Sequence, residues 1–167
     1  MHDPILVINA GSSSIKFSVF ETAADRSLLA GAHGQVEGIG TSPHLEVADA
    51  RGARLADQAV GAEGHGGAIV AIHEWFAAHV GHETGFAGVG HRVVHGGLTY
   101  SEPVLIDDHV MSDLAALVPL APLHQPHNIA AIRAIAALAP KVPQVAYAAS
   151  ASFVRAHACF SFAERIS

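Results

Sequence analysis

The start of the chain predicts two strands joined by a tight turn. Residues 4–8 (PILVI) form a short, continuous apolar run, which is typical of a buried central strand. Residues 15–19 alternate between apolar and polar side chains, the period of a strand with one buried face. The sequence GSSS between them is a polar turn. Weaker strands are expected at residues 27–38 and 44–49, where glycines interrupt or flank the pattern.

Further strands alternate with helices along the rest of the chain. Residues 85–97 (GFAGVGHRVVHGG) predict a strand that ends at a diglycine turn, and residues 142–148 (VPQVAYA) predict a last strand. Residues 64–80 carry apolar side chains three and four positions apart, which predicts a helix. The face of this helix that we expect to pack on the core comprises Ile69, Ile72, Trp75, Phe76, His79 and Val80.

Two more helices are predicted between the last two strands. The first begins near Asp107 or Asp108, whose carboxylates serve a helix start, and it is stopped by Pro119 and Pro122. The second covers residues 127–140 and ends at a proline. The order of strands, helix, strand, helices and strand indicates an α/β fold.

Composition narrows the class of protein. The chain has 167 residues, which suits one domain, and half of them are hydrophobic. Its formal net charge of −6 argues against nucleic acid or an anionic membrane as the main partner. A single cysteine, Cys159, forms no internal disulfide, and no apolar run reaches the length of a membrane span. We expect no signal peptide and a cytoplasmic location.

Histidine is abundant, with 13 residues. Their spacings contain no His-Glu-x-x-His run and no pairing with cysteine, so a metal site is not expected from them. A histidine-rich metal-binding protein remains an alternative, which a zinc titration without stoichiometric uptake would remove.

The polar turn after the first strand offers a first candidate site. A turn of glycine and serine directs backbone N–H groups toward one point, and Lys16 adds a positive charge. By strand parity, Lys16 projects away from the core side of Ile15 and Phe17. Asn9, at the end of the first strand, can reach a phosphate or a hydrated cation. The segment lacks Walker spacing, and an ordinary polar hairpin remains the alternative.

A second candidate site combines two segments. Arg92 and Val94 are two positions apart on a predicted strand and share a face, so they suit a small carboxylate with a short alkyl tail. Leu123 and His124 lie in a proline-rich loop before a helix, where the imidazole could donate to a phosphoryl oxygen. The alternatives are a structural ion pair for the arginine and an ordinary loop or helix-start histidine.

These segments together resemble one known family. The sequences ILVINAGSSSIKF, GHRVVHGG and LAPLHQPHNIAAI occur in the order and at separations like those of acetate kinases, the acetokinase family of the sugar-kinase/Hsp70/actin superfamily. The form Ala-Gly-Ser-Ser-Ser is more similar to acetate kinases than to butyrate kinases. Residues 4–147 resemble the N-terminal domain of the family. The resemblance implies a ribonuclease H-like, actin-like ATPase domain, a mixed sheet flanked by helices.

The resemblance also implies a reaction and its residues. ATP and acetate would give acetyl phosphate and ADP, reversibly, with Mg²⁺. Asn9 would lie at the magnesium site, and Arg92 would hold the substrate carboxylate. His124 would contact the transferring phosphoryl group. The remaining roles would be the ATP phosphate site for Ser12, Ser14 and Lys16, and the methyl pocket for Val94 and Leu123.

The resemblance breaks off near residue 147. The family continues there with Phe-Asp-Thr-Ala-Phe-His, whose aspartate is essential, whereas this chain reads YAASASF and has Ala149 near that position. We therefore expect residues 148–167 to form a divergent tail and the family's C-terminal nucleotide-binding domain to be absent from this chain. We expect little or no kinase activity from this chain alone, and no family-type homodimer.

Two other readings of the resemblance stay open. The chain could belong to a propionate or butyrate kinase, which the size of the pocket near Val94 and Leu123 would decide. It could also be a non-catalytic module that binds phosphate or carboxylate without turnover.

Overall fold

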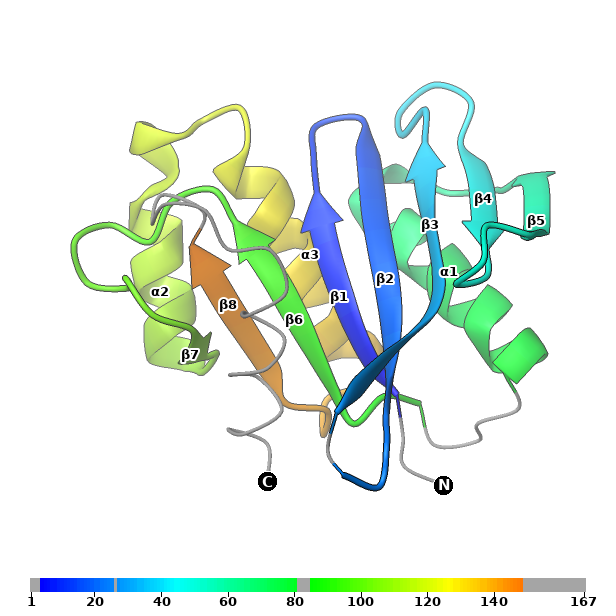
Figure 1. The fold of residues 1–167 in the computed structure, drawn as a ribbon. Coiled ribbons are helices and arrows are strands. Elements are labelled where there is room, and N and C mark those ends of the chain that lie inside the picture. Colours follow the sequence, from blue (N-terminus) through cyan, green and yellow to red (C-terminus); the bar gives the residue numbers. More distant parts are fainter. Residues whose placement is uncertain (1–3, 26, 81–84, 149–167) are drawn as a thin grey trace.

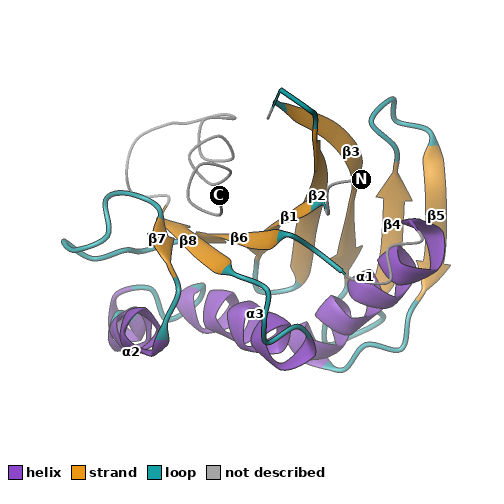
Figure 2. Ribbon diagram, turned by 90° about the horizontal axis from the view of Figure 1, so that it is seen from below, coloured by secondary structure: helices purple, strands orange, loops and turns teal. Residues whose placement is uncertain are grey.

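The computed structural model describes residues 4–25, 27–80 and 85–148. Eight strands form one mixed sheet in the order β5-β4-β3-β2-β1-β6-β8-β7 (Figure 1). Three α-helices cover one face of this sheet (Figure 2). The elements are β1 Ile5–Ala10, β2 Ser14–Thr22, β3 Leu28–Glu37, β4 His44–Ala48, β5 Arg54–Ala59, α1 Gly64–Val80, β6 Gly88–Val93, β7 Val104–Leu105, α2 Asp108–Ala116, the 3₁₀-helix η1 Val118–Leu120, α3 Gln125–Leu138 and β8 Gln144–Ala148.

The predicted α/β class is confirmed, and the opening hairpin is central to it. β1 pairs antiparallel with β2 and parallel with β6, and β6 pairs parallel with β8. The carboxyl ends of β1, β6 and β8 therefore meet at one edge of the sheet. Since α3 leads directly into β8, it runs back from that edge, and its N-terminus lies there too (Figure 1).

The core lies between the sheet and the helices. Ile15, Phe17 and Val19 of β2 are buried against it, whereas Lys16 on the opposite face is exposed, as the alternation predicts. Helix α1 has the predicted bounds and buries four of the side chains expected on its core face: Ile69, Ile72, Trp75 and Phe76.

One residue of that expected face was placed wrongly. His79 is exposed, because its ring stacks on Trp75 near the end of α1, and its Nδ1 lies 2.8 Å from the Trp75 carbonyl oxygen. The side chain of Val80 lies outside the described residues.

The bounds of several elements differ from those predicted. β6 ends at Val93, before the diglycine, so Val94 lies one residue beyond the strand. Helix α3 begins at Gln125, two residues earlier than expected, because a proline fits the first helical turn. β5 and β7 were not predicted from the sequence.

The start of α2 follows the prediction. Asp107 is its N-cap and accepts a hydrogen bond from the Val110 N–H at 2.8 Å, and Asp108 lies in the first turn. Among the described helices, none has the length and apolarity that a membrane crossing requires.

Candidate functional site

Both candidate sites meet at the edge where β1 and β6 end. The β1–β2 turn, the end of β6 and the start of α3 lie at this edge (Figure 1). The structure thus brings together segments that are about 80 and 30 residues apart in the sequence, through the parallel pairing of β1 with β6.

Three of the predicted residues form a row across adjacent strands. Asn9 on β1 is the register partner of Lys16 on β2 and of Arg92 on β6. All three project from the sheet face that the helices do not cover, because their neighbours in sequence are buried on the helix side. The Arg92 guanidinium donates from Nη1 to Asn9 Oδ1 at 3.3 Å, so the first and second candidate sites are in contact.

The two cations of this row are available to an anion. Lys16 and Arg92 are exposed, and within the described residues neither forms an ion pair with a carboxylate. The structural ion pair considered for Arg92 is therefore not found in this part of the chain. Two positive side chains flanking one amide suit an oxyanion such as a phosphate or a carboxylate.

Backbone hydrogen bonds hold the turn between β1 and β2. The Gly11 N–H donates to the Ser14 carbonyl at 2.8 Å, and the Ile39 N–H donates to the Ser13 carbonyl at 3.0 Å. Ser12 is exposed at the tip, and Ser14 is half-buried where β2 begins. Neither serine is therefore buried in the core, and both belong to the turn and strand start that follow Asn9.

The residues of the second candidate site are more exposed than a pocket for an alkyl group requires. Val94 is half-buried, and Leu123 is 73% exposed. His124 caps α3 without a side-chain hydrogen bond and is exposed. In the described residues these side chains form no closed pocket for an alkyl group, so a pocket needs a further covering surface.

Buried polar side chains support this edge from the helix side. Asn128, 2% exposed on α3, donates to the Ala10 carbonyl at 2.8 Å and accepts from the Val94 N–H at 3.0 Å. Gln125 donates to the His95 carbonyl at 3.1 Å and to the Leu114 carbonyl at 3.2 Å. These residues were missed in the sequence, although a polar Asn128 in line with Ile132 and Ile135 was a signal.

A histidine of α1 also supports this edge of the sheet. His65 is buried, and its Nε2 lies 2.6 Å from the Gly11 carbonyl oxygen. Its ring stacks on His127 of α3 at a centroid distance of 4.4 Å. Burial, and then the nearby His65 and His124, lower the pKa of His127 and so favour its neutral form.

Two further groups fix the strand and the loop after it. His91 faces the core, and its Nε2 lies 2.7 Å from Gln144 Oε1; burial lowers its pKa to about 4. Tyr100 donates to Asp113 Oδ2 at 2.5 Å, and this bond, with the nearby acidic charge, raises the pKa of Tyr100 to about 12.

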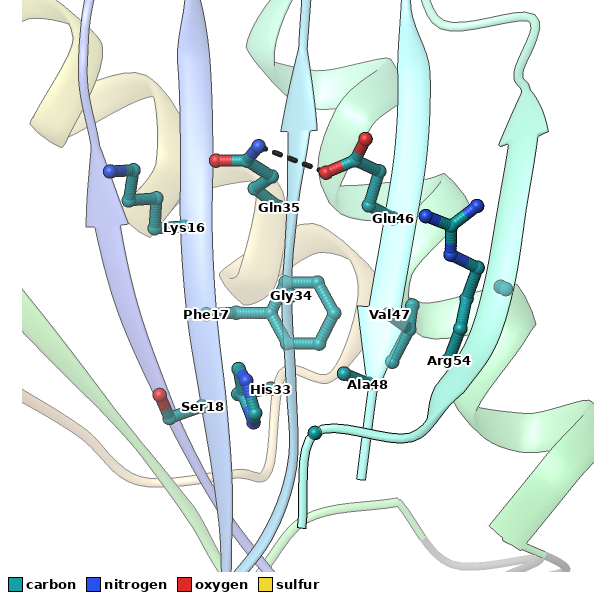
Figure 3. Close-up of a pocket in the computed structure, with 12 residues that line it drawn as sticks. Lys16, Phe17, Ser18, His33, Gly34, Gln35, Glu46, Val47, Ala48 and Arg54 are labelled. Atoms are coloured by element: carbon teal, nitrogen blue, oxygen red, sulfur yellow. Dashed lines mark hydrogen bonds between the residues drawn. The ribbon is translucent and has the colours of Figure 1, made fainter. Parts of the chain in front are cut away.

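Beyond Lys16, the row of paired side chains continues across β3 and β4, away from the candidate site. Lys16 pairs in register with Gln35 on β3, and Gln35 donates to Glu46 on β4 at 3.2 Å over an open hollow of about 440 Å³ (Figure 3). Arg54 of β5 also lines this hollow. The hollow borders the candidate site through Lys16.

The far end of the row holds a group of three potential metal ligands that the histidine spacings did not reveal: His44, Glu46 and Asp57. The Asp57 carboxylate already contacts His44 Nε2 at 2.6 Å and the Arg54 guanidinium. The bond to His44 and the charge of Arg54 lower the pKa of Asp57. Because these partners already neutralise and hydrogen-bond the carboxylate, we interpret the group as an ion-pair network.

Comparisons of the sequence with known proteins all identify the same family. The model of the acetokinase family matches residues 4–161. Over 116 residues, the chain is 46% identical to an acetate kinase of Rhizobium meliloti, covering 68% of this chain and 29% of that protein. It is 44% identical over 119 residues to an acetate kinase of Nitrobacter hamburgensis, with coverages of 70% and 29%. The chain thus spans under a third of these curated relatives.

Solved structures agree with the sequence matches. A crystal structure of Porphyromonas gingivalis acetate kinase superposes with a TM-score of 0.79 and 26% identity, covering 97% of this chain and 43% of that one. A propionate kinase from Francisella tularensis gives a TM-score of 0.76 and 29% identity, covering 89% and 37%. The predicted fold, a mixed sheet with flanking helices of the actin-like ATPase type, is confirmed.

The extent of the match bears on the predicted boundary. The family model continues to residue 161, beyond residue 147, where the resemblance in the sequence breaks off. Most of the tail, including Ala149, lies outside the described residues. The division into residues 4–147 and a divergent tail stays a prediction.

Proposed function

Because the chain belongs to the acetokinase family, we propose that it supplies the phosphate-binding and carboxylate-binding part of an acetate kinase. The reaction is the transfer of the γ-phosphoryl group of ATP to acetate, giving acetyl phosphate and ADP. One observation carries this proposal: Lys16, Asn9 and Arg92 lie side by side on three paired strands, with both cations free of carboxylate partners in the described residues.

Each side chain has a role that its position supports. The Arg92 fork holds the acetate carboxylate, and Lys16 contacts the phosphate oxygens with Ser12 and Ser14. Val94 and Leu123 lie on the side of the acetate methyl group. His124, exposed at the start of α3, donates to the transferring phosphoryl group.

The chemistry needs positioning and charge stabilisation more than proton transfer. An acetate oxygen forms a bond to the γ-phosphorus, and the bond from that phosphorus to the bridging oxygen breaks in line. The electron pair of the broken bond leaves with ADP. Lys16 and Arg92 balance the charge on the transferring group, and both lie within the same row.

Asn9 fits a metal that arrives with the nucleotide. It offers one amide oxygen, which accepts a hydrogen bond from Arg92. Mg²⁺ in kinase sites is held by one or two carboxylates and by substrate phosphates, and none of the neighbours of Asn9 in the row is a carboxylate. We therefore assign Asn9 to the hydrated shell of a magnesium–ATP complex, where the ion would offset phosphate charge.

We further propose that the 167-residue chain alone has little or no kinase activity and does not form the family's homodimer. No acidic residue occurs between Asp113 and Glu164, so no carboxylate follows β8 where the family motif has its aspartate. The exposed Leu123 also leaves the alkyl end of the site uncovered. The cytoplasm, which supplies ATP, is the proposed location.

A propionate kinase function is the second candidate. The superposed Francisella tularensis structure is a propionate kinase, and Leu123 is 73% exposed, so the described residues do not close the alkyl end of the site against a longer chain. A comparison of acetyl phosphate with propionyl phosphate as ligands separates the two functions, because the tighter ligand identifies the substrate that the pocket fits.

The test combines binding and turnover. We expect acetyl phosphate to bind the purified chain and to lose about ten- to a hundredfold in affinity in Lys16→Ala or Arg92→Ala, since each removes charged hydrogen bonds. Arg133→Ala, an exposed arginine elsewhere on α3, is the matched control and keeps wild-type affinity. Binding unaffected by both site variants contradicts the proposed site. Acetyl phosphate formation above the Lys16→Ala background contradicts the proposed inactivity.

A further inference from the structure

Two successive carbonyl groups of the turn region are held by side chains from the helix layer. The Ala10 carbonyl accepts from Asn128 of α3 at 2.8 Å, and the Gly11 carbonyl is 2.6 Å from Nε2 of His65 in α1. A carbonyl oxygen can only accept, so Nε2 of His65 carries the hydrogen of this bond. His65 is 9% exposed, and the bond itself is partly buried.

The bond to His65 fixes the direction of the next peptide N–H. A trans peptide is planar, with its C=O and N–H pointing in opposite directions, and the described residues contain no cis peptide. The Gly11 carbonyl points into the helix layer, toward His65. The N–H of Ser12, which belongs to the same peptide, therefore points away from that layer, toward the exposed tip of the turn.

The ring of His65 is itself held in place. It stacks on His127, 4.4 Å away, and His127 is half-buried beside the start of α3. A side chain that is fixed by stacking loses little further entropy when it holds a carbonyl, so its bond keeps one peptide orientation populated.

We propose that His65 is a positioning residue of the anion site, which orients the Gly11–Ser12 peptide so that the Ser12 N–H donates to a phosphate oxygen. This inference deepens the proposed function and rests on it for the identity of the anion. It assigns a role to a residue of α1, a helix that contributes no side chain to the Asn9–Lys16–Arg92 row.

The experiment follows the backbone amides by ¹⁵N–¹H NMR while inorganic phosphate is added. His65→Phe keeps an aromatic ring against His127 but removes the donor. We expect its dissociation constant for phosphate to rise about tenfold and the response of the Ser12 amide to shrink. His65→Gln restores a donor at the position of Nε2 and brings the affinity back to within about twofold of the wild type.

His79→Phe is the matched control on the same helix. His79 also stacks on an aromatic ring and lies within hydrogen-bond distance of a backbone carbonyl, at 2.8 Å from Trp75 O, but this carbonyl belongs to α1 itself. We expect wild-type phosphate affinity in this variant. Side-chain nitrogen shifts of wild-type His65 provide a measurement that needs no variant, and they must report hydrogen on Nε2.

The outcomes separate the inference from the proposed function. A folded His65→Phe variant with wild-type affinity and a wild-type Ser12 response overturns the inference, as does a wild-type His65 without hydrogen on Nε2. If the wild type binds no phosphate, the proposed function fails. The free protein then still tests the peptide orientation, because His65→Phe must move the Gly11 and Ser12 signals while His79→Phe must not.

Discussion

The two ends of one polar row across the sheet differ in how their charges are neutralised. At one end, Lys16 and Arg92 flank Asn9 and have no carboxylate partner among the described residues. At the other end, Asp57 contacts both His44 and Arg54. Pairing across adjacent strands aligns polar side chains at both ends, so alignment alone does not distinguish a binding site from a surface network. The lack of a carboxylate partner for Lys16 and Arg92 in the described region is what favours their end as the proposed binding site.

The support beneath the two ends differs as well. Below the candidate site, the buried side chains of Asn128, His65 and His91 all lie within hydrogen-bond distance of a polar partner. Below β4, the helix-facing residues Leu45 and Val47 are apolar. Buried polar groups must be satisfied and therefore fix the backbone around them, whereas apolar contacts are less directional. We infer that the site end is the more precisely positioned.

The largest effect that we expect from the buried polar support is a loss of stability at acidic pH, caused by protonation of His91. Its pKa is lowered to about 4 in the folded protein, below its ordinary value of 6.5, so the unfolded chain takes up the proton first as pH falls. The contribution of the buried, neutral His91 to the free energy of unfolding is fully present above pH 6.5, and it is lost as the pH falls to about 4. The free energy of unfolding should fall by about 3 kcal/mol over that range because of this group.

Urea unfolding of the wild type and of His91→Gln at pH 7, 5 and 4 measures this contribution. The variant lacks the titrating group and should lose less stability than the wild type as the pH falls. His109→Gln, which changes an exposed histidine of α2, is the control and should keep the wild-type pH dependence. Identical pH profiles for all three proteins would show that His91 is not buried in a neutral form.

Two strand glycines provide the next comparison. A Cβ at Gly34 of β3 would clash with the Glu46 carbonyl oxygen and would lie 2.9 Å from Phe17 Cζ, whereas a Cβ at Gly90 of β6 would meet Val7 Cγ2 at 3.8 Å. We expect Gly34→Ala to lower the free energy of unfolding by about 1–3 kcal/mol through overpacking. Gly90→Ala should be neutral or slightly stabilising, because glycine weakens a strand.

Chemical denaturation of the two variants in parallel checks this prediction. A Gly34→Ala protein as stable as Gly90→Ala would contradict the close packing of β3 against β2 and β4 at Gly34, which lines the hollow beside Gln35 and Glu46.

The smallest expected effect is at the ion-pair end of the row. Asp57→Ala removes the partner of His44 and Arg54 but exposes no core, so we expect a small loss of stability that shrinks in high salt. Acetyl phosphate binding should not change. Thermal unfolding in low and high salt measures the loss, and a large loss that does not depend on salt would show that this network stabilises the fold.

Local pattern predicted most of the sheet and helices because their apolar faces are buried as the alternation requires. β5 escaped prediction because its sequence, RLADQA, has no β-branched residue, and Ala56 is its one partly buried side chain. Its pairing with β4, not its own propensity, makes it a strand. His79 was expected in the core, but stacking on Trp75 holds it at the surface.

The candidate site was predictable in its parts but not in its support. Asn9, Lys16 and Arg92 belong to motifs that can be read in the sequence, and strand pairing places them together. The contact of Asn128 with Ala10 joins residues 118 positions apart, and that of His65 with Gly11 joins residues 54 positions apart. No local pattern encodes such contacts. The roles of all the predicted site residues, those of Asn9, Lys16 and Arg92 included, stay predictions.

The most direct test of the account is the affinity of the chain for acetyl phosphate in three proteins: wild type, Arg92→Ala and Arg54→Ala. Isothermal titration at low ionic strength should show binding by the wild type and by Arg54→Ala, and a loss of about ten- to a hundredfold in Arg92→Ala. Equal effects of the two arginines, or no effect of either, would contradict the claim that the un-neutralised end of the row is the binding site.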